Sequence, residues 1–285
     1  MTKPRTALRS LLCTMLALLS VPALASPTQA AVPVYRGPQV FHGQAFDTCS
    51  APALSLLRAW RRSSPYGALG IYIGGTNRGC SQPRLNRAYV QQATAMGWRL
   101  LPLYVGAQAP CVASPHGRGE RIGYWSGFTQ GQNEGADAVR AARALGLGAS
   151  SPVYLDMEAY VRDRGRCSLA VLRYTTAWSR IVHSGGYLAG FYSSASSGVA
   201  DLASLSAYRE AALTSTAQQN GLPDVIWYAR WDRRDSTDGY RALGAGQWSG
   251  HRRLHQYLAN HVEDHGGQGL LIDRNAVDAP VAVVG

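Results

Sequence analysis

Two carboxylates, Asp156 and Glu158, end the apolar segment PVYLDME at residues 152–158. The segment is typical of a buried strand, in which residues i and i+2 point to the same face. Both acids then project together, with backbone positions about 6.6 Å apart. Repulsion between adjacent acids raises the pKa of one of them, and glycoside hydrolysis needs a protonated acid beside an ionised carboxylate. The alternative is structural, with one acid paired to an arginine and the other solvated.

Eight short apolar segments follow residue 31, and amphipathic segments with helical spacing lie between most of them. The predicted strands are 40–47, 68–74, 98–106, 152–158, 186–193, 224–231, 253–257 and 269–274, and the predicted helices are 51–62, 84–96, 135–145 and 168–184. This alternation predicts a single-domain α/β fold, a (β/α)8 TIM-type barrel. Segments 231–253 and 259–267 show little helical pattern, so we expect degenerate late helices. A doubly wound sheet is the alternative, but the chain lacks the motif G-x-G-x-x-G, and we expect no cofactor.

Acids stand at several predicted strand ends, where barrel enzymes carry their catalytic residues. Asp47 ends the first strand, Asp156 and Glu158 end the fourth, Asp232 follows the sixth, and Asp273 lies near the end of the eighth. Each acid alone has a structural explanation, such as capping a helix or pairing with an arginine. Together they predict one cleft at the barrel mouth, with Glu158, Asp156, Asp47 and Asp273 as the catalytic candidates.

Aromatic and amide side chains accompany the acids. Aromatic rings stack on sugar faces, and amides bind sugar hydroxyls, although aromatics on strands also pack in cores. The candidates for substrate binding are Tyr72, Tyr104, Gln108, Tyr160, Tyr192, Trp231, Gln256 and Tyr257. Some of the aromatics are expected in the core instead, Tyr72 and Trp227 first.

The N-terminal segment has the pattern of a secretory signal peptide. Lys3, Arg5 and Arg9 precede the apolar residues 11–25, and small residues around position 30 resemble a cleavage site. The predicted division is therefore a signal peptide at 1–30 and a secreted barrel domain at 31–285. No later segment has 18 uninterrupted apolar residues, so we expect no membrane span in the mature chain.

The chain is basic, with a formal net charge of +11, and Lys3 is its single lysine. A positive charge carried by arginine attracts anionic surfaces such as cell-wall polymers. Nucleic acid is a poor alternative, because no arginine run exceeds a pair and no aromatic–basic recognition motif is present. The sequence says nothing about the oligomeric state.

Four cysteines remain after Cys13 leaves with the predicted signal peptide: Cys49, Cys80, Cys111 and Cys167. An even number in a secreted chain predicts two disulfides, with three possible pairings. Metal binding is not expected, since none of the four cysteines has the C-x-x-C spacing of a zinc site. Because loops after neighbouring barrel strands lie close together, the barrel prediction favours the pairs Cys49–Cys80 and Cys111–Cys167.

Several motifs in order resemble the glycoside-hydrolase-like domain of exported actinobacterial proteins, once classed as a domain of unknown function and related to the family 25 lysozymes. The motifs are FDTCSAP at 46–52, GIYIGG at 70–75, PLYVG at 102–106, YLDME at 154–158, GFYS at 190–193 and HQY at 255–257. The resemblance runs from about Phe41 to Asp278, which is nearly the whole mature chain.

The resemblance implies a TIM-type barrel with a glycan cleft and peptidoglycan as the substrate. Asp47 matches the acid that ends the first strand of the lysozymes, and Asp156 and Glu158 match their D-x-E pair, with Glu158 in the general-acid place. The segment 273–275, Asp-Arg-Asn, matches a D-x-N near the last strand. The four cysteines and the long segment 107–127 depart from the lysozyme pattern.

The sequence therefore predicts a secreted glycoside hydrolase that acts on peptidoglycan-type cell-wall polysaccharide. The alternative is a glycan-binding barrel module at the cell wall that has kept the fold and lost turnover.

Overall fold

The computed structural model describes residues 1–2, 38–112, 119–163, 165–204 and 221–285. The chain divides into two units, residues 1–34 and residues 35–285. Nearly all of the predicted signal peptide, from residue 3 onward, lies outside the described residues. Every helix and strand among the described residues belongs to the second unit.

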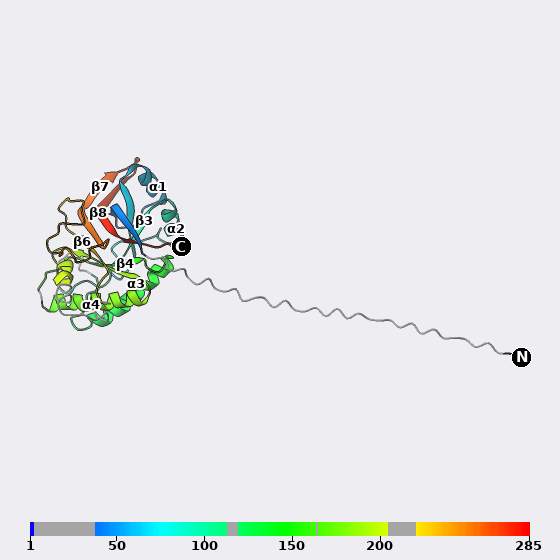
Figure 1. Cartoon of the computed structure of the whole chain (residues 1–285), viewed down its shortest axis with the longest axis horizontal. Coiled ribbons are helices and arrows are strands. Elements are labelled where there is room, and N and C mark those ends of the chain that lie inside the picture. Colours follow the sequence, from blue (N-terminus) through cyan, green and yellow to red (C-terminus); the bar gives the residue numbers. More distant parts are fainter. Residues whose placement is uncertain (3–37, 113–118, 164, 205–220) are drawn as a thin grey trace. The chain divides into compact units, whose positions relative to one another are not determined.

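Eight strands form a closed barrel in sequence order, which confirms the predicted TIM-type fold (Figure 1). They are β1 Gln39–Asp47, β2 Tyr66–Gly74, β3 Arg99–Tyr104, β4 Pro152–Met157, β5 Leu188–Ser194, β6 Val225–Ala229, β7 Arg253–Asp264 and β8 Gly269–Val281. Neighbouring strands from β1 to β7 are parallel.

Strand β8 runs antiparallel to both of its neighbours, β7 and β1. The sequence pattern placed Asp273 at the carboxyl end of an eighth parallel strand, and this part of the prediction was wrong. Only residues 265–268 separate β7 from β8, whereas a parallel connection needs a crossover of a dozen or more residues. Asp273 therefore lies within β8, directly opposite Asp47 on β1.

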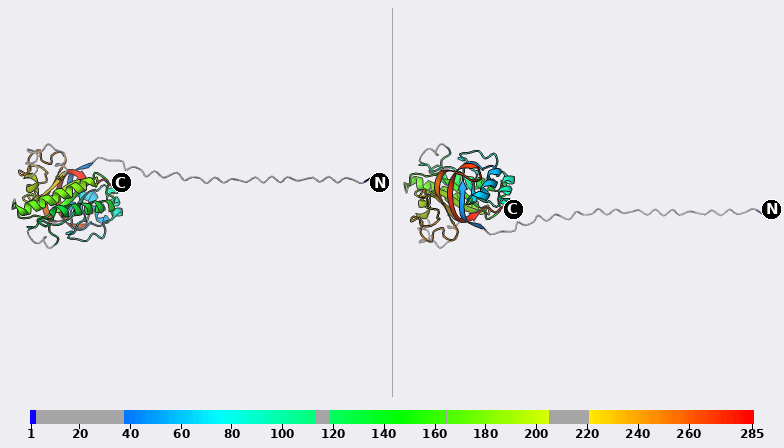
Figure 2. Two further views of the ribbon diagram at one scale, coloured as in Figure 1. Left: turned by 90° about the horizontal axis from the view of Figure 1, so that it is seen from below. Right: turned by 90° about the horizontal axis from the view of Figure 1, so that it is seen from above.

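Four helices follow the first four strands: α1 Leu54–Ser63, α2 Arg87–Ala95, α3 Gly127–Ala144 and α4 Arg166–Ser184. Helices α3 and α4 lie side by side against the barrel (Figure 2, green). Helix α3 begins eight residues before its predicted start at residue 135. Its extra turns hold Gly127 and Gly131, and a Cβ at Gly131 would lie 2.3 Å from the Tyr174 carbonyl of α4. The glycines that lower helix propensity here allow the two helices to approach closely.

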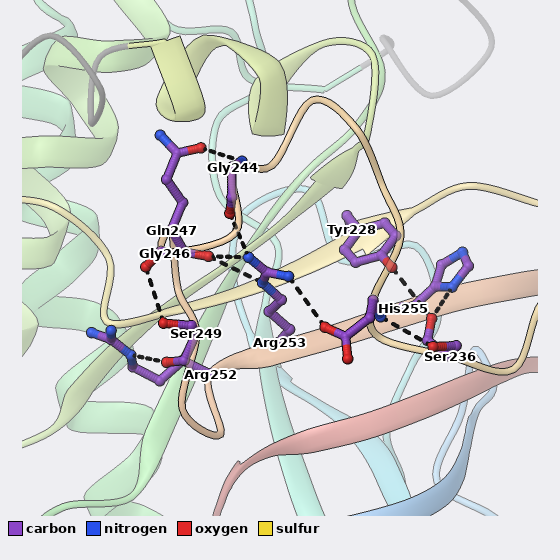
Figure 3. A network of polar contacts seen from close by, with 10 residues as sticks. Tyr228, Ser236, Gly244, Gly246, Gln247, Ser249, Arg252, Arg253 and His255 are labelled. Atoms are coloured by element: carbon purple, nitrogen blue, oxygen red, sulfur yellow. Dashed lines mark hydrogen bonds and ion pairs between the residues drawn. The ribbon is translucent and has the colours of Figure 1, made fainter.

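The late helices are degenerate, as predicted. Residues 198–204 after β5 are helical, but the fully described connection 230–252 between β6 and β7 contains turns and no helix. Two side chains on the outer face of β7, Arg253 and His255, hold this connection instead (Figure 3). Arg253 donates to the carbonyls of Gln247 and Gly244, and the ring nitrogens of His255 lie 2.7 Å and 2.8 Å from the carbonyls of Ser236 and Arg230.

Side chains alternate along each strand between two cores. Inward positions such as Ala45, Leu103, Tyr154 and Trp227 fill the barrel. Outward positions such as Phe46 pack against the helices in a second, larger core. This alternation decides which residues at a strand end can reach the barrel mouth.

Both predicted disulfides are confirmed. Cys49 is bonded to Cys80, which joins the segments after β1 and β2, and Cys111 is bonded to Cys167, which joins the segment after β3 to α4. Among the described residues, no helix has the length and apolar character needed to cross a membrane.

Candidate active site

Polar side chains form the uppermost inward layer of the barrel, where the apolar filling ends. On β1, for example, Ala45 belongs to the interior core and the next inward residue is Asp47. The same change from apolar to polar occurs on β4, where Tyr154 is followed inward by Asp156. This layer includes Asp47, Tyr72, Asp156, Tyr192, Gln256, Asp273 and Asn275.

The four predicted catalytic acids line one cavity of about 480 Å³. Asp47, Asp156, Glu158 and Asp273 thus converge as the sequence predicted, although they come from strands far apart in the chain. Tyr72, Gln108 and the Cys49–Cys80 disulfide are also in its wall, together with Asn77, Arg78 and Asn260.

A second cavity of about 540 Å³ shares Glu158 with the first. Its wall includes the rings of Tyr192, Trp231 and Tyr240 and the cation of Arg230. The Trp231 side chain is 63% exposed, so a flat aromatic surface faces solvent beside the cavity. Glu158 therefore lies at the junction of two adjoining cavities.

Asp47 is a buried carboxyl, 2% exposed, with three hydrogen-bond donors. Tyr72 donates its hydroxyl to Oδ1 at 3.2 Å, and Asn275 and Gln256 donate their amides to Oδ2 at 2.8 Å and 3.3 Å. Burial and the charge of Asp273 outweigh these donors and raise the pKa of Asp47 to about 7.

Asp156 is 3% exposed, and its Oδ1 has no hydrogen-bond partner among the described residues. Burial, followed by the negative charges of Glu158 and Asp47, raises the pKa of Asp156 well above its ordinary value. The neutral carboxyl group is therefore favoured, and it can both donate and accept hydrogen bonds.

Asp273 accepts a hydrogen bond from the Asn260 backbone N–H at 2.6 Å and another from Gln256 at 3.2 Å. Burial raises the pKa of this carboxyl, the Asn260 hydrogen bond lowers it, and the charge of Glu158 raises it further, with a net increase. The cleft therefore holds acids whose ionisation is opposed by low solvent access and by one another.

Gln256 is 2% exposed and forms hydrogen bonds with residues in the walls of both cavities. Its Nε2 donates to Asp47 and to Asp273, while its Oε1 accepts from the Tyr192 hydroxyl and the Trp231 indole, each at 3.0 Å. We expected Gln256 to bind sugar hydroxyls, but its amide holds the acids and the aromatic wall in place.

Three predicted binding residues do not reach the cleft. Tyr104 and Tyr160 belong to the outer core, where their hydroxyls donate to Asp137 and Asp201, and Tyr257 donates to Gln44. Tyr104 and Tyr257 each follow an inward-facing position by one residue, and a shift of one residue turns a strand side chain to the opposite face. Asp232 is likewise absent from the wall of either cavity and lies 3.1 Å from Arg230.

Two residues that donate hydrogen bonds to the acids were not among the predicted candidates. Asn275 is fully buried, donates to Asp47 and accepts from the Trp227 indole at 2.8 Å. Its position two residues after Asp273 on one strand was a usable signal. Asn260, whose contribution is a backbone N–H from a residue with a φ of 53°, left no comparable signal. Among the described residues, no group of three or more histidines, cysteines or acids could hold a metal ion.

The fold and the cleft define a TIM-type barrel protein with a carboxylate cluster at its mouth. The chain belongs to the Rv2525c-like family of glycoside hydrolase-like domains, which it matches over residues 58–277. No curated protein sequence matches it.

The solved structures to which this chain is similar have low sequence identity to it. An uncharacterized protein of B. stearothermophilus has 20% identity and a TM-score of 0.50, with 82% of this chain and 95% of that chain covered. The catalytic domain of endolysin ply40 from bacteriophage P40 of Listeria monocytogenes has 13% identity, a TM-score of 0.44 and coverages of 83% and 93%. A muramidase from Acremonium alcalophilum has 15% identity, a TM-score of 0.42 and coverages of 82% and 92%. At 20% identity, the similarity to the B. stearothermophilus protein shows the fold alone.

Proposed function

We propose that this protein is a secreted glycoside hydrolase that cleaves peptidoglycan-type cell-wall polysaccharide. The observation that carries the proposal is the position of Glu158 at the junction of two cavities, beside the buried acids Asp156 and Asp47. A polymer that crosses this junction would occupy both cavities and bring a glycosidic bond to Glu158. Membership of a glycoside hydrolase-like family supports the same reaction class.

In this mechanism Glu158 protonates the leaving glycosidic oxygen, and positive charge develops on the sugar ring. Asp156 acts either as the nucleophile or by orienting the acetamido group of the sugar, whose oxygen then attacks. The raised pKa of Asp156 and its oxygen without a partner favour the orienting role, because a neutral carboxyl is a poor nucleophile. Asp47 and Asp273 stabilise the oxocarbenium charge when they are ionised.

The walls of the cleft suit a sugar polymer. Tyr72 lines the first cavity, and Tyr192 and Trp231 line the second, so aromatic rings are available on both sides of Glu158. Gln256 holds Tyr192 and Trp231 through hydrogen bonds. Such fixed rings can stack on sugar faces without first losing side-chain freedom.

Secretion to the cell wall is part of the proposal. Two disulfides are typical of proteins in oxidising compartments, and the sequence of residues 1–30 has the pattern of a signal peptide. The arginine-based positive charge would favour binding to anionic wall polymers.

The test is the release of reducing sugar ends from purified peptidoglycan by the wild type and by Glu158→Gln. The variant keeps the side-chain shape but cannot deliver a proton, so its rate should fall at least about 10²-fold while its binding to the same glycan persists. Glu120→Gln, a change of an exposed glutamate, is the matched control and should keep the wild-type rate. Equal rates for wild type and Glu158→Gln would refute the mechanism. Binding by both proteins without cleavage of any wall preparation would support the glycan-binding module instead.

A further inference from the structure

On one side of β4, the D-x-E segment extends beyond the end of its pairing with β3. Strand β3 pairs with β4 through Leu103 opposite Tyr154 and Tyr104 opposite Leu155. On the other side, β5 continues alongside β4 through the pair Met157 and Ser193. The backbone from Asp156 to Glu158 is therefore flanked by a strand on the β5 side and by the chain after β3 on the other.

The side chain of Gln108 occupies the place that β3 has left. Its Nε2 donates to the Asp156 carbonyl at 3.0 Å, and its Oε1 accepts from the Glu158 backbone N–H at 2.7 Å. In a parallel sheet, one residue of a strand bonds to the carbonyl and the N–H of the two residues that flank its neighbour. The Gln108 amide makes this same pair of bonds around Met157, so it replaces a backbone partner.

Gln108 is itself held in position. Its backbone N–H donates to the Glu120 carbonyl at 3.0 Å, and its carbonyl accepts from Ile122 at 2.8 Å. The preceding residue, Ala107, donates its N–H to the carboxylate of Glu134 on α3 at 2.9 Å. The second hydrogen of the Gln108 amide bonds to the Gly106 carbonyl at 3.0 Å. With 2% exposure and these bonds, the side chain is a fixed support and has little capacity left for sugar hydroxyls.

We propose that Gln108 is the positioning residue for the general acid, a role that rests on the proposed function of Glu158. It acts through the backbone on either side of Met157 and does not touch the reacting atoms. A general acid must lie within about 2.6–3.2 Å of the oxygen that it protonates, and a misplacement of about 1 Å can lower a rate about 10²-fold. Because the segment after β3 fixes the Gln108 amide, the amide fixes the backbone at Glu158 and thereby the direction of the Glu158 side chain.

The test compares Gln108→Met with Gln130→Met. Methionine has a similar length and removes the amide. Gln130 is a matched control, because its amide also bonds backbone groups of the segment after β3, namely Gly123 N–H and the Arg121 carbonyl, and no backbone group of β4 among the described residues. Hydrogen exchange at the Glu158 amide and the steady-state rates on purified peptidoglycan are measured for both variants. Gln108→Asn, which withdraws the amide by one carbon, serves if the methionine variant does not fold.

We expect Gln108→Met to speed exchange at the Glu158 amide about tenfold, as for the loss of one hydrogen bond. Its kcat should fall about 10-fold to 10²-fold with KM within about twofold of the wild type, and Gln130→Met should change neither quantity. Unchanged exchange, or faster exchange with an unchanged kcat, overturns the proposal, and so does a rise in KM alone, which would mark Gln108 as a sugar-binding residue. If the wild type cleaves no wall preparation, the proposed function fails, while exchange still decides whether Gln108 holds this backbone.

Discussion

Replacing Asp47 with asparagine should make the protein more stable and less active. The pKa of Asp47 rises from 3.8 to about 7 on folding, because the carboxyl is buried and faces Asp273. The folded state then binds the proton more tightly than the unfolded chain. The stability contributed by this protonated group is fully present below pH 3.8 and is lost as the pH rises through about 7.

The size of the effect follows from the shift. A rise of about three pKa units corresponds to about 4 kcal/mol between the two ends of the titration. Asparagine cannot ionise, and its amide can still bond to the Asn275 and Gln256 amides through oxygen and to the Tyr72 hydroxyl through nitrogen. The difference in unfolding free energy between the variant and the wild type should therefore be about 4 kcal/mol larger, in favour of the variant, at about pH 8 than at about pH 3.5.

Urea unfolding followed by tryptophan fluorescence at several pH values measures this gain. The same variant should cleave peptidoglycan more slowly, because it lacks a negative charge next to the developing positive charge on the sugar. A difference in unfolding free energy that changes by less than about 1 kcal/mol across this range would refute the claim that burial raises the Asp47 pKa. An unchanged cleavage rate would remove Asp47 from the mechanism.

Two further predictions concern the support of the cleft and of α4. A Cβ at Gly70 would lie 2.5 Å from the Asp47 Cβ, so Gly70→Ala should destabilise the protein by about 1–3 kcal/mol and lower its cleavage rate. Gly246 has open space around it, so Gly246→Ala is the control and should change neither quantity. Equal urea midpoints for the two variants would contradict this prediction. Asp163 accepts from the backbone N–H groups of Gly165, Cys167 and Ser168, which lower its pKa to about 2. Asp163→Ala should therefore lower the free energy of unfolding by about 1 kcal/mol near neutral pH. This loss should disappear as the pH falls from 3.8 through about 2, because the Asp163 carboxylate is then protonated in the folded wild type as well. A loss that persists in acid would show that the carboxylate is not the cause.

The sequence was sufficient to predict the barrel, the disulfides and the convergence of the acids. Strand count and order decide which loops are neighbours, and the pairs Cys49–Cys80 and Cys111–Cys167 follow from that order. Asp47, Asp156 and Glu158 stand out because each lies at the end of an apolar strand, whereas Asp273 reaches the same cleft from within β8, whose direction the sequence did not predict.

The sequence was less informative about the direction in which side chains point. Tyr104 and Tyr257 are one residue away from inward positions, and only the register of the strands reveals that difference. The roles of Gln108 and Gln256 depend on contacts between residues far apart in the chain, such as the bond from Gln256 to Asp47. His255 is buried against the connection that replaces a helix, and no local pattern marks such a contact.

The antiparallel β8 has a consequence for how the molecule folds. It forms a local hairpin with β7, but its other partner is β1, and the bond between Asn275 and Asp47 joins residues 228 positions apart. Contacts of such sequence separation form late, because the entropy of closing a long loop must be overcome first. Docking of β8 is therefore both the closure of the barrel and the step that brings Asp273 against Asp47. A nascent chain that ends before residue 273 therefore lacks both Asp273, which lies opposite Asp47, and Asn275, which donates a hydrogen bond to Asp47.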